Sequence, residues 1–411
     1  MKNNPFISKE FTSVWSKHFN KSKPEIRFKF IKDLSFVKNK YLPMYTNMGK
    51  NLTNGLSYKL QMNESDYKNK VFFIYDIPEY INQSNPETGS LKLKSVKQYK
   101  GYLANLDNYT NLDDYLADNF TAKSRRKFRM YKRRLEESFN IDYKMYYGDN
   151  MTKEQYDVAF DYFNKLLKKR YTEKRINNHY LAEKKWSYLR EVCYPMILSK
   201  KASLFVIFDN NTPIAVSINY IADDIDFGAL TVFDIDYTKF NIGFIDIMKH
   251  LEWCIENNIR IFDFSKGDFD YKKRWGNKIY NFDYHILYDS SSVIAKLIAS
   301  SLAGYFSLKQ TLREKDLHTR FHKLIFLLKG NKNTNTKNFQ VIKDDNEIPE
   351  NDLQLIDYNT DEYAFLKKIV YDLIFNAPEA ISDVNVYLVK GLEDTYCMKG
   401  KKTNIKFKLS P

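Results

Sequence analysis

The sequence predicts an α+β protein built around a mixed α/β sheet. Short apolar runs rich in β-branched and aromatic residues alternate with segments of helical periodicity, and 43% of the 411 residues are hydrophobic, enough for sizeable cores. Turn residues separate three consecutive strands, which predicts an antiparallel meander. A helix then crosses over before the next strand, Ile261 to Phe264, so that strand should pair in parallel with Asp226 to Phe233.

Composition limits the class of partner and the compartment. The formal net charge of +14 favours an anionic partner, whether nucleic acid, a membrane surface or a phosphate-bearing cofactor, and charge does not choose among them. Cys193, Cys254 and Cys397 lie in apolar surroundings without CxxC spacing, which fits a reducing compartment. The first residues lack the apolar core of a signal peptide, and the run Val293 to Phe306 is shorter than the ~20 residues of a membrane span. A cytoplasmic protein is therefore expected.

Changes in pattern along the chain predict five regions. Residues 1–118 hold short aromatic-rich strands, residues 119–290 the central domain, and residues 291–330 a basic helical segment. A polar and acidic linker is expected over 331–352, followed by a small α+β module over 353–411. We assign no function to that module.

A basic helix is predicted from Thr121 to about Ser138. Phe128, Tyr131 and Leu135 recur at helical spacing and give it an apolar seam. Its basic flank is either a solvated surface or a face turned toward a phosphate-rich ligand. Since no finger, basic-zipper or RNP pattern is present, nucleic acid is not the expected partner.

The central domain continues with a regular order of elements. After the basic helix we expect a strand, two helices beginning near Thr152 and Glu183, the meander, a loop leading into a helix, and two further strands. The strands are predicted at Ile141–Tyr147, Ala202–Phe208, Pro213–Ile221, Asp226–Phe233, Ile261–Phe264 and Asn281–Tyr288, the last of which should close the sheet.

Two loops stand out as sites for a ligand. The loop Tyr237 to Gly243 precedes a helix whose free N–H groups and positive dipole end suit a pyrophosphate. The strand Ile261 to Phe264 runs into a polar loop, at the kind of sheet edge where α/β proteins bind ligands. The alternative for this second loop is an ordinary turn with a solvated charged face. Its polar residues include Ser265, Lys266, Asp268, Tyr271, Lys272 and Arg274.

The order of elements is that of the GNAT acyltransferase fold, and three motifs resemble one branch of it. Ser124-Arg-Arg, Phe240-Asn-Ile-Gly243 and Phe262-Asp-Phe-Ser-Lys-Gly-Asp-Phe-Asp-Tyr-Lys-Lys-Arg-Trp275 are similar to the cellulose-biosynthesis-type acetyltransferases, relatives of the Fem peptidoglycan aminoacyltransferases. The resemblance covers about residues 120 to 290. The N-terminal residues also look like that branch's leading half, a degenerate GNAT-like unit in the Fem relatives.

The resemblance implies transfer of an acyl group, acetyl in the simplest case, from coenzyme A to an amine without a covalent enzyme intermediate or a metal. Asp234 would be the base, with Asp236 or His285 as substitutes, and Tyr271 the acid, with Asp268 beside it. Each also has an ordinary structural reading: a turn cap for the aspartates, a packed ring for the tyrosine, an ion pair between Lys266 and Asp268. The implied pyrophosphate ligands are Asn241, Ile242, Gly243 and Phe244, and the implied substrate-binding residues are Lys266, Lys272, Asp236 and His285.

The donor and the acceptor stay open. The GNAT pattern of Gln or Arg, two residues, Gly, one residue, then Gly or Ala survives here only at Gly243, because Thr238 and Asn241 occupy the other places. A carrier protein or an aminoacyl-tRNA is thus an alternative donor. The expected acceptor is an amino sugar or another small-molecule or saccharide amine of the cell envelope. A catalytically inactive scaffold that binds an envelope-polysaccharide assembly is a further alternative.

The basic segment 296–329 either contacts a membrane surface or packs on a neighbouring domain. His318 and His322 have the i, i+4 spacing of a metal pair but no third ligand accompanies them. No metal site is predicted there.

Overall fold

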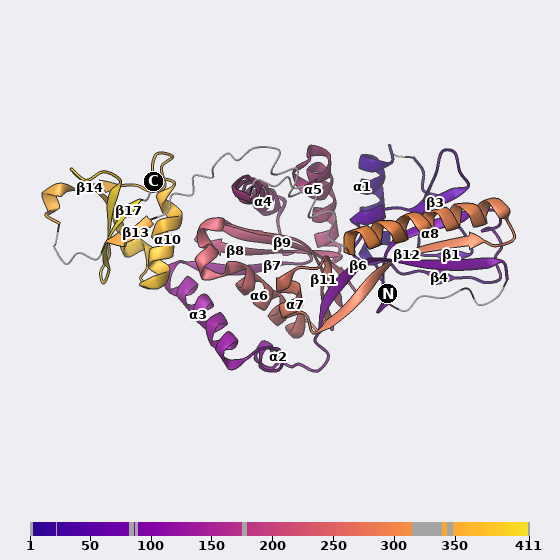
Figure 1. Cartoon of the computed structure of the whole chain (residues 1–411), viewed down its shortest axis with the longest axis horizontal. Helices are drawn as coiled ribbons and strands as arrows, with labels where there is room; N and C mark the ends of the chain where they lie inside the picture. Colours follow the sequence, from indigo (N-terminus) through magenta and orange to yellow (C-terminus); the bar gives the residue numbers. More distant parts are fainter. Residues whose placement is uncertain are drawn as a thin grey trace.

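The computed structural model describes residues 3–21, 23–81, 86, 89–174, 179–314, 339–342 and 348–409. The molecule is elongated, with the N-terminal strands at one end, the central domain in the middle and the C-terminal module at the other end (Figure 1).

A ten-stranded mixed sheet forms the backbone of the fold, in the order β2-β3-β5-β12-β6-β11-β10-β9-β8-β7. The meander of β8, β9 and β10 is antiparallel, and β10 pairs in parallel with β11, as predicted. In chain order the strands are β2 (Phe36–Lys38), β3 (Met44–Asn47), β5 (Val71–Pro78), β6 (Leu91–Asn105), β7 (Ile141–Tyr146), β8 (Ala202–Asp209), β9 (Thr212–Ala222), β10 (Ile225–Phe233), β11 (Ile261–Lys266) and β12 (Lys278–Asp289). β1 (Ile31–Lys32) and β4 (Lys59–Leu60) pair separately.

The expectation that the strand near residues 281–288 closes the sheet is wrong. β12 pairs on one side with β6 and on the other with β5, and β6 also pairs with β11. A strand from the N-terminal part therefore lies between the last two strands of the central domain. The sheet is continuous across the boundary that we predicted near residue 118.

Helices cover both faces of this sheet. In the central domain, α4 (Lys153–Lys174) and α5 (Glu183–Leu198) contribute to one core cluster, and α3 (Ala122–Ser138) and α6 (Ile242–Glu256) to another. Strand periodicity explains the two clusters, because Leu204 and Val206 belong to the first and Phe205 and Ile207 to the second. The other helices are α1 (Lys9–Phe19), α2 (Leu112–Asn119), α7 (Asp270–Trp275), α8 (Val293–Glu314), η1 (Pro5–Ile7), η2 (Lys50–Leu52), η3 (His179–Leu181) and η4 (Ile235–Phe240).

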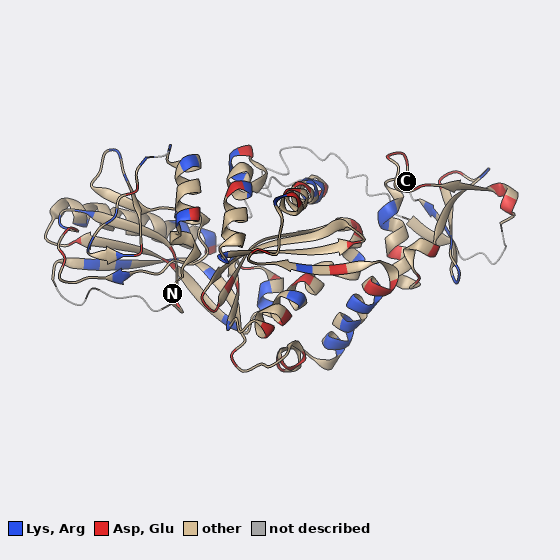
Figure 2. Ribbon diagram, turned by 180° about the vertical axis from the view of Figure 1, so that it is seen from behind, with Lys and Arg blue, Asp and Glu red and all other residues tan. Residues whose placement is uncertain are grey.

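The predicted basic helix is α3. Thr121 caps it by accepting a hydrogen bond from the Ser124 N–H at 3.3 Å. Phe128 and Leu135 are fully buried, whereas Lys123, Arg126 and Lys127 are exposed. Figure 2 shows that Lys and Arg positions recur along the helix. The apolar seam thus holds the helix beside α6 and leaves the basic flank in solvent.

The C-terminal module is a five-stranded sheet with one helix, α10 (Leu366–Asn376). α10 docks on the central domain, where Tyr371 packs against Phe139 with ring centroids 4.7 Å apart. Its strands are β13 (Phe339–Ile342), which falls inside the predicted linker, β14 (Leu353–Ile356), β15 (Asn385–Val389), β16 (Thr395–Lys399) and β17 (Asn404–Leu409), with η5 (Glu350–Asp352) and η6 (Ile381–Asp383) between them.

His318 and His322 lie outside the described residues. Within the described ranges, we find neither a cluster of His, Cys, Asp and Glu suited to a metal ion nor a helix with the length and apolar character to span a membrane.

Candidate functional site

The strongest candidate for a ligand site is a notch where β10 and β11 part. The two strands pair from Ile225 and Ile261 to Phe227 and Asp263, although both continue beyond that point. A bulge in β10 between Gly228 and Leu230 accompanies the separation. Thr231 is exposed even though β10 lies inside the sheet, so the notch opens the sheet to solvent.

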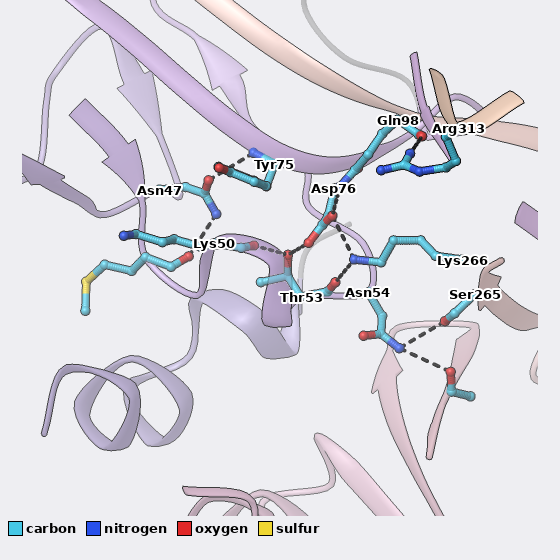
Figure 3. A network of polar contacts seen from close by, with 12 residues as sticks. Asn47, Lys50, Thr53, Asn54, Tyr75, Asp76, Gln98, Ser265, Lys266 and Arg313 are labelled. Carbon is cyan, nitrogen blue, oxygen red and sulfur yellow. Dashed lines mark hydrogen bonds and ion pairs between the residues drawn. The ribbon is translucent and has the colours of Figure 1, made fainter. Parts of the chain in front are cut away.

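A residue from the N-terminal part of the chain, Asn54, contacts both strands at this notch. The Asn54 side-chain amide donates to the Gly228 carbonyl of β10 at 3.1 Å and to the Ser265 hydroxyl of β11 at 2.9 Å (Figure 3). One side chain therefore bridges the two parted strands. At the next residue, Gly55, a β-carbon would lie 2.7 Å from the Phe227 ring, so the close approach of this segment requires glycine.

Lys266, at the end of β11, is held by the same N-terminal segment (Figure 3). Its ammonium group lies 2.7 Å from a carboxylate oxygen of Asp76 and donates to the Thr53 carbonyl at 2.8 Å. Asp76 is fully buried and also accepts hydrogen bonds from the Thr53 hydroxyl and the Gln98 amide, both at 2.7 Å. The partner of Lys266 is thus Asp76 and not Asp268, and its role toward substrate stays a prediction.

The start of α6 has the features of an anion site. Asn241 adopts left-handed backbone angles and its carbonyl accepts from the Phe244 N–H at 2.8 Å. Among the described residues, the Ile242 and Gly243 N–H groups have no hydrogen-bond partner. A β-carbon at Gly243 would lie 3.0 Å from the Phe233 ring, so glycine allows the start of α6 to lie this close to Phe233.

Two guanidinium groups flank this helix start, and sequence reasoning missed the first of them. Arg170 lies 4.3 Å from the centre of the Phe233 ring, and Arg274 lies 5.2 Å from that of Phe244. Neither group forms an ion pair with another described residue. The free N–H groups and the two guanidinium groups together fit a pyrophosphate.

Tyr271 lies on a helix, α7, where we expected a loop. The residue as a whole is 43% exposed, and its ring stacks on that of Phe269 with centroids 6.1 Å apart. Burial, with a smaller contribution from the Asp246 carboxylate, raises the pKa of the Tyr271 hydroxyl to about 12. The phenol therefore keeps its proton at neutral pH, as a general acid must.

Asp234 and Asp236 share one partner, Lys169 of α4. The Lys169 ammonium forms ion pairs with both carboxylates and lies 2.6 Å from Asp236. Burial, with the neighbouring Asp234 charge, raises the pKa of Asp236. Asp234 also caps η4 by accepting a hydrogen bond from the Asp236 N–H at 3.1 Å. The turn-capping role that we gave as the structural alternative for this residue is therefore observed. The ring contacts of Tyr271 are with Phe264 and Phe269, and among the described residues no hydrogen bond or ion pair joins this cluster to Tyr271.

Lys272 is the most perturbed lysine near the notch. It is 4% exposed, and its ammonium group donates to the carbonyls of Ser265 at 3.1 Å and Lys266 at 2.7 Å. Burial lowers its pKa to about 8. Lys272 thus holds the end of β11, and it loses its proton closer to neutral pH than an ordinary lysine does.

Asp268 and His285 have other partners and do not belong to the cluster of Asp234, Asp236 and Lys169. Asp268 pairs with Lys273 at 2.8 Å and accepts from the Tyr102 hydroxyl at 2.6 Å, and these contacts lower its pKa. His285 lies in β12, is buried beside the Tyr58 hydroxyl at 2.7 Å, and has its pKa lowered to about 4 by burial. The imidazole is therefore neutral at pH 7.

A buried carboxylate that we did not predict connects to the notch. Asp246 of α6 accepts from the Ser217 hydroxyl at 2.7 Å, and Ser217 lies 2.9 Å from the Thr231 hydroxyl at the notch wall. Asp246 is 3% exposed, and burial raises its pKa. The signal for it in the sequence is a carboxylate between two apolar residues, Ile245 and Ile247, in the apolar first half of the helix.

Comparison with known proteins identifies the central segment. Residues 122–273 match the model of the acetyltransferase (GNAT) domain family. The comparison with curated protein sequences gave no match. Three solved structures with weak likeness are FemX, the C-terminal domain (DUF2156) of a putative lysylphosphatidylglycerol synthetase from Agrobacterium fabrum, and a tandem GNAT protein from the clavulanic acid biosynthesis pathway.

FemX is 12% identical with a TM-score of 0.44, covering 65% of this chain and 86% of that one. The synthetase domain is 10% identical with a TM-score of 0.42, covering 72% and 91%, and the tandem protein is 9% identical with a TM-score of 0.33, covering 61% and 77%. These likenesses are too weak to carry an argument about function. The family match, in contrast, covers the segment from α3 into α7 and confirms the predicted fold class and enzyme class: residues 122–273 hold a GNAT-type acyltransferase domain.

Proposed function

We propose that this chain is an N-acyltransferase that moves an acyl group, acetyl in the simplest case, from an acyl-coenzyme A to an amine bound in the notch. The observation that carries the proposal is the parting of β10 and β11 after Phe227 and Asp263, together with the GNAT match of this segment. The thioester of coenzyme A supplies the activated acyl group when bound.

The residues at the start of α6 would hold the donor. The N–H groups of Ile242 and Gly243 would offer a positive dipole end to the pyrophosphate, and Arg170 and Arg274 would add positive charge beside it. This role does not need the glycine missing at position 241, because the left-handed backbone of Asn241 still leaves the next two N–H groups without partners.

Proton movements would fall to two groups, an acid and a base. The amine nitrogen forms the new bond to the acyl carbon, the carbon–sulfur bond breaks, and Tyr271 donates its proton to the departing sulfur. The proton lost by the amine goes to a carboxylate. Asp246 can receive it through the hydroxyls of Thr231 and Ser217, while Asp234 and Asp236 stay alternatives.

A comparison of two aspartate variants separates these bases. If Asp246 accepts the proton, Asp246→Asn lowers kcat about 10²-fold or more and Asp236→Asn changes it little. The reverse result assigns the role to the cluster with Lys169. Tyr271→Phe should lower kcat about 10²-fold without weakening acyl-CoA binding, and an unchanged kcat would remove Tyr271 from the mechanism.

Calorimetric titration with acetyl-coenzyme A tests the donor directly. We expect binding that weakens roughly fivefold or more in Arg170→Ala. The neighbouring Lys168→Ala is a matched control, because Lys168 is exposed on the same helix. If the unmodified protein gives no calorimetric binding signal with any acyl-CoA, acyl-coenzyme A is not the donor.

For the acceptor we propose an amino sugar or another amine-bearing precursor of the cell envelope. The support is the resemblance of the three sequence motifs to the cellulose-biosynthesis-type branch. Release of free thiol from acetyl-coenzyme A in the presence of a panel of amino sugars measures turnover. Binding of acyl-CoA without thiol release for any acceptor would favour the inactive scaffold.

One observation keeps aminoacyl-tRNA as a second candidate donor. On α3, Lys123, Arg126 and Lys127 form no ion pair with another described residue, so a basic surface is available beside α6. Binding of tRNA that weakens steeply with added salt is the expected result for this candidate. Absence of tRNA binding at low salt would eliminate it.

A further inference from the structure

The outer face of α8 carries large apolar side chains in addition to those that pack on the sheet. The helix covers one face of β5, β12 and β6 (Figure 1). Its buried residues are Ala295, Ala299 and Phe306, whereas Leu297 and Leu308 are 64% and 60% exposed. A surface helix normally turns its large apolar residues inward. The exposed apolar residues of α8 are Val293, Ile294, Leu297, Tyr305, Leu308 and Leu312.

Positive charge flanks this outer face. Lys296 and Lys309 are exposed on the helix, and Lys94 of β6 reaches it by donating to the Ser300 hydroxyl at 3.1 Å. The one acidic residue in the sequence of α8 is Glu314, its last. No carboxylate of α8 itself therefore interrupts the apolar face before the last residue of the helix.

A basic hollow lies at the same corner as the start of α8. It has a volume of about 390 Å³ and is lined by Lys38, Lys40, Tyr41, Leu42, Pro43, Tyr45, Lys68, Asn69 and Lys70. The Asn69 N–H donates to Asp289 at 2.9 Å, and Asp289 also accepts from the Ser291 N–H just before α8. Tyr41 is 82% exposed.

The lysines of this hollow are not held in ion pairs with described residues. None of the ammonium groups of Lys38, Lys40, Lys68 and Lys70 forms an ion pair with a carboxylate of a described residue. Exposed Tyr41 and Leu42 sit among them. The hollow thus repeats the combination found on α8, with apolar side chains at the surface and lysines around them.

We propose that the outer face of α8 and the lysine-lined hollow form one surface that docks on an anionic phospholipid bilayer. The apolar side chains would enter the boundary of the acyl chains while the lysines meet the lipid phosphates. Charge complementarity selects this occupant over a second copy of the chain. In a two-fold pairing of α8 with itself, lysine flanks would face lysine flanks. Of the predicted basic segment 296–329, the structure describes residues 296–314, and these belong to the proposed surface.

Vesicle flotation of the full chain tests the proposal. We expect the protein to float with vesicles of phosphatidylglycerol, to float less as salt is added, and to stay unbound with vesicles of phosphatidylcholine. Leu297→Glu with Leu308→Glu should lower binding at least tenfold, and Lys38→Gln with Lys40→Gln roughly fivefold for each lysine. Leu355→Glu is the matched control, because Leu355 is 63% exposed on β14 in the C-terminal module.

Three results would overturn the proposal. They are equal binding to the two lipids, binding unchanged by the α8 double variant, and a dimer in sedimentation that this variant dissolves while vesicles do not bind. The last result would make a second copy the occupant. Titration of each variant with acetyl-coenzyme A shows that the donor site is intact, so that loss of vesicle binding is separate from the proposed transferase function.

Discussion

Replacement of Lys266 by methionine should destabilise the central sheet far more than loss of an ordinary surface charge. The change removes the ammonium group 2.7 Å from Asp76 and leaves that carboxylate, which is 0% exposed, with neutral donors alone. Breaking a buried ion pair costs about 3–5 kcal/mol. Because the Lys266 side chain is 19% exposed, some solvent screening remains, and we expect about 3 kcal/mol.

The assay is urea denaturation of the full chain, comparing midpoints at unchanged slope. Lys273→Met is the control, since its partner Asp268 lies at 2.8 Å with both side chains about half exposed, and such a pair contributes ~1 kcal/mol or less. Adding Asp76→Asn to Lys266→Met should recover part of the loss, because it removes the buried charge. If Lys266→Met costs no more than Lys273→Met, the reasoning that this pair is buried and coupled is refuted.

Three further predictions concern stability. Folding lowers the pKa of Lys272 from 10.5 to about 8. Between these pH values the unfolded chain binds more protons than the folded one, so stability should rise with pH by up to ~3 kcal/mol. Thermal midpoints of Lys272→Met, measured across this pH range, should lack that rise. Burial raises the Asp263 pKa from 3.8 to about 6, so stability should fall as pH increases through this window, and Asp263→Asn should flatten the fall in the same measurement. A β-carbon at Gly101 would meet the Tyr280 ring at 2.3 Å, so Gly101→Ala should lower the free energy of unfolding by roughly 1–3 kcal/mol in urea; a neutral effect would mean that the ring moves aside.

Local signals predicted the features that depend on neighbours in sequence. The basic helix that begins after Thr121, the antiparallel meander and the parallel pairing of β10 with β11 all follow from residues within one or two elements. The helix α7 was missed because Gly267 and Asp268, just before it, are typical of turns.

Features that join distant segments could not be read from the sequence. The pairing of Lys266 with Asp76, and the bridge that Asn54 makes between the parted strands, connect residues about half the chain apart. Hydrophobic periodicity reports which face of a strand is buried and does not name its neighbour. For the same reason we did not foresee that β6 lies between β11 and β12.

The place of β6 also has a consequence for the order of folding. Leu93 pairs with Leu287 of β12, and Leu103 pairs with both Asp263 of β11 and Lys278. During synthesis at the usual rate, β6 must wait on the order of ten to forty seconds for these partners to emerge. Until then its edges are open to wrong pairing. We therefore expect the chain to fold late and to depend on chaperones more than its stable core suggests, and the central domain expressed without residues 1–118 should aggregate.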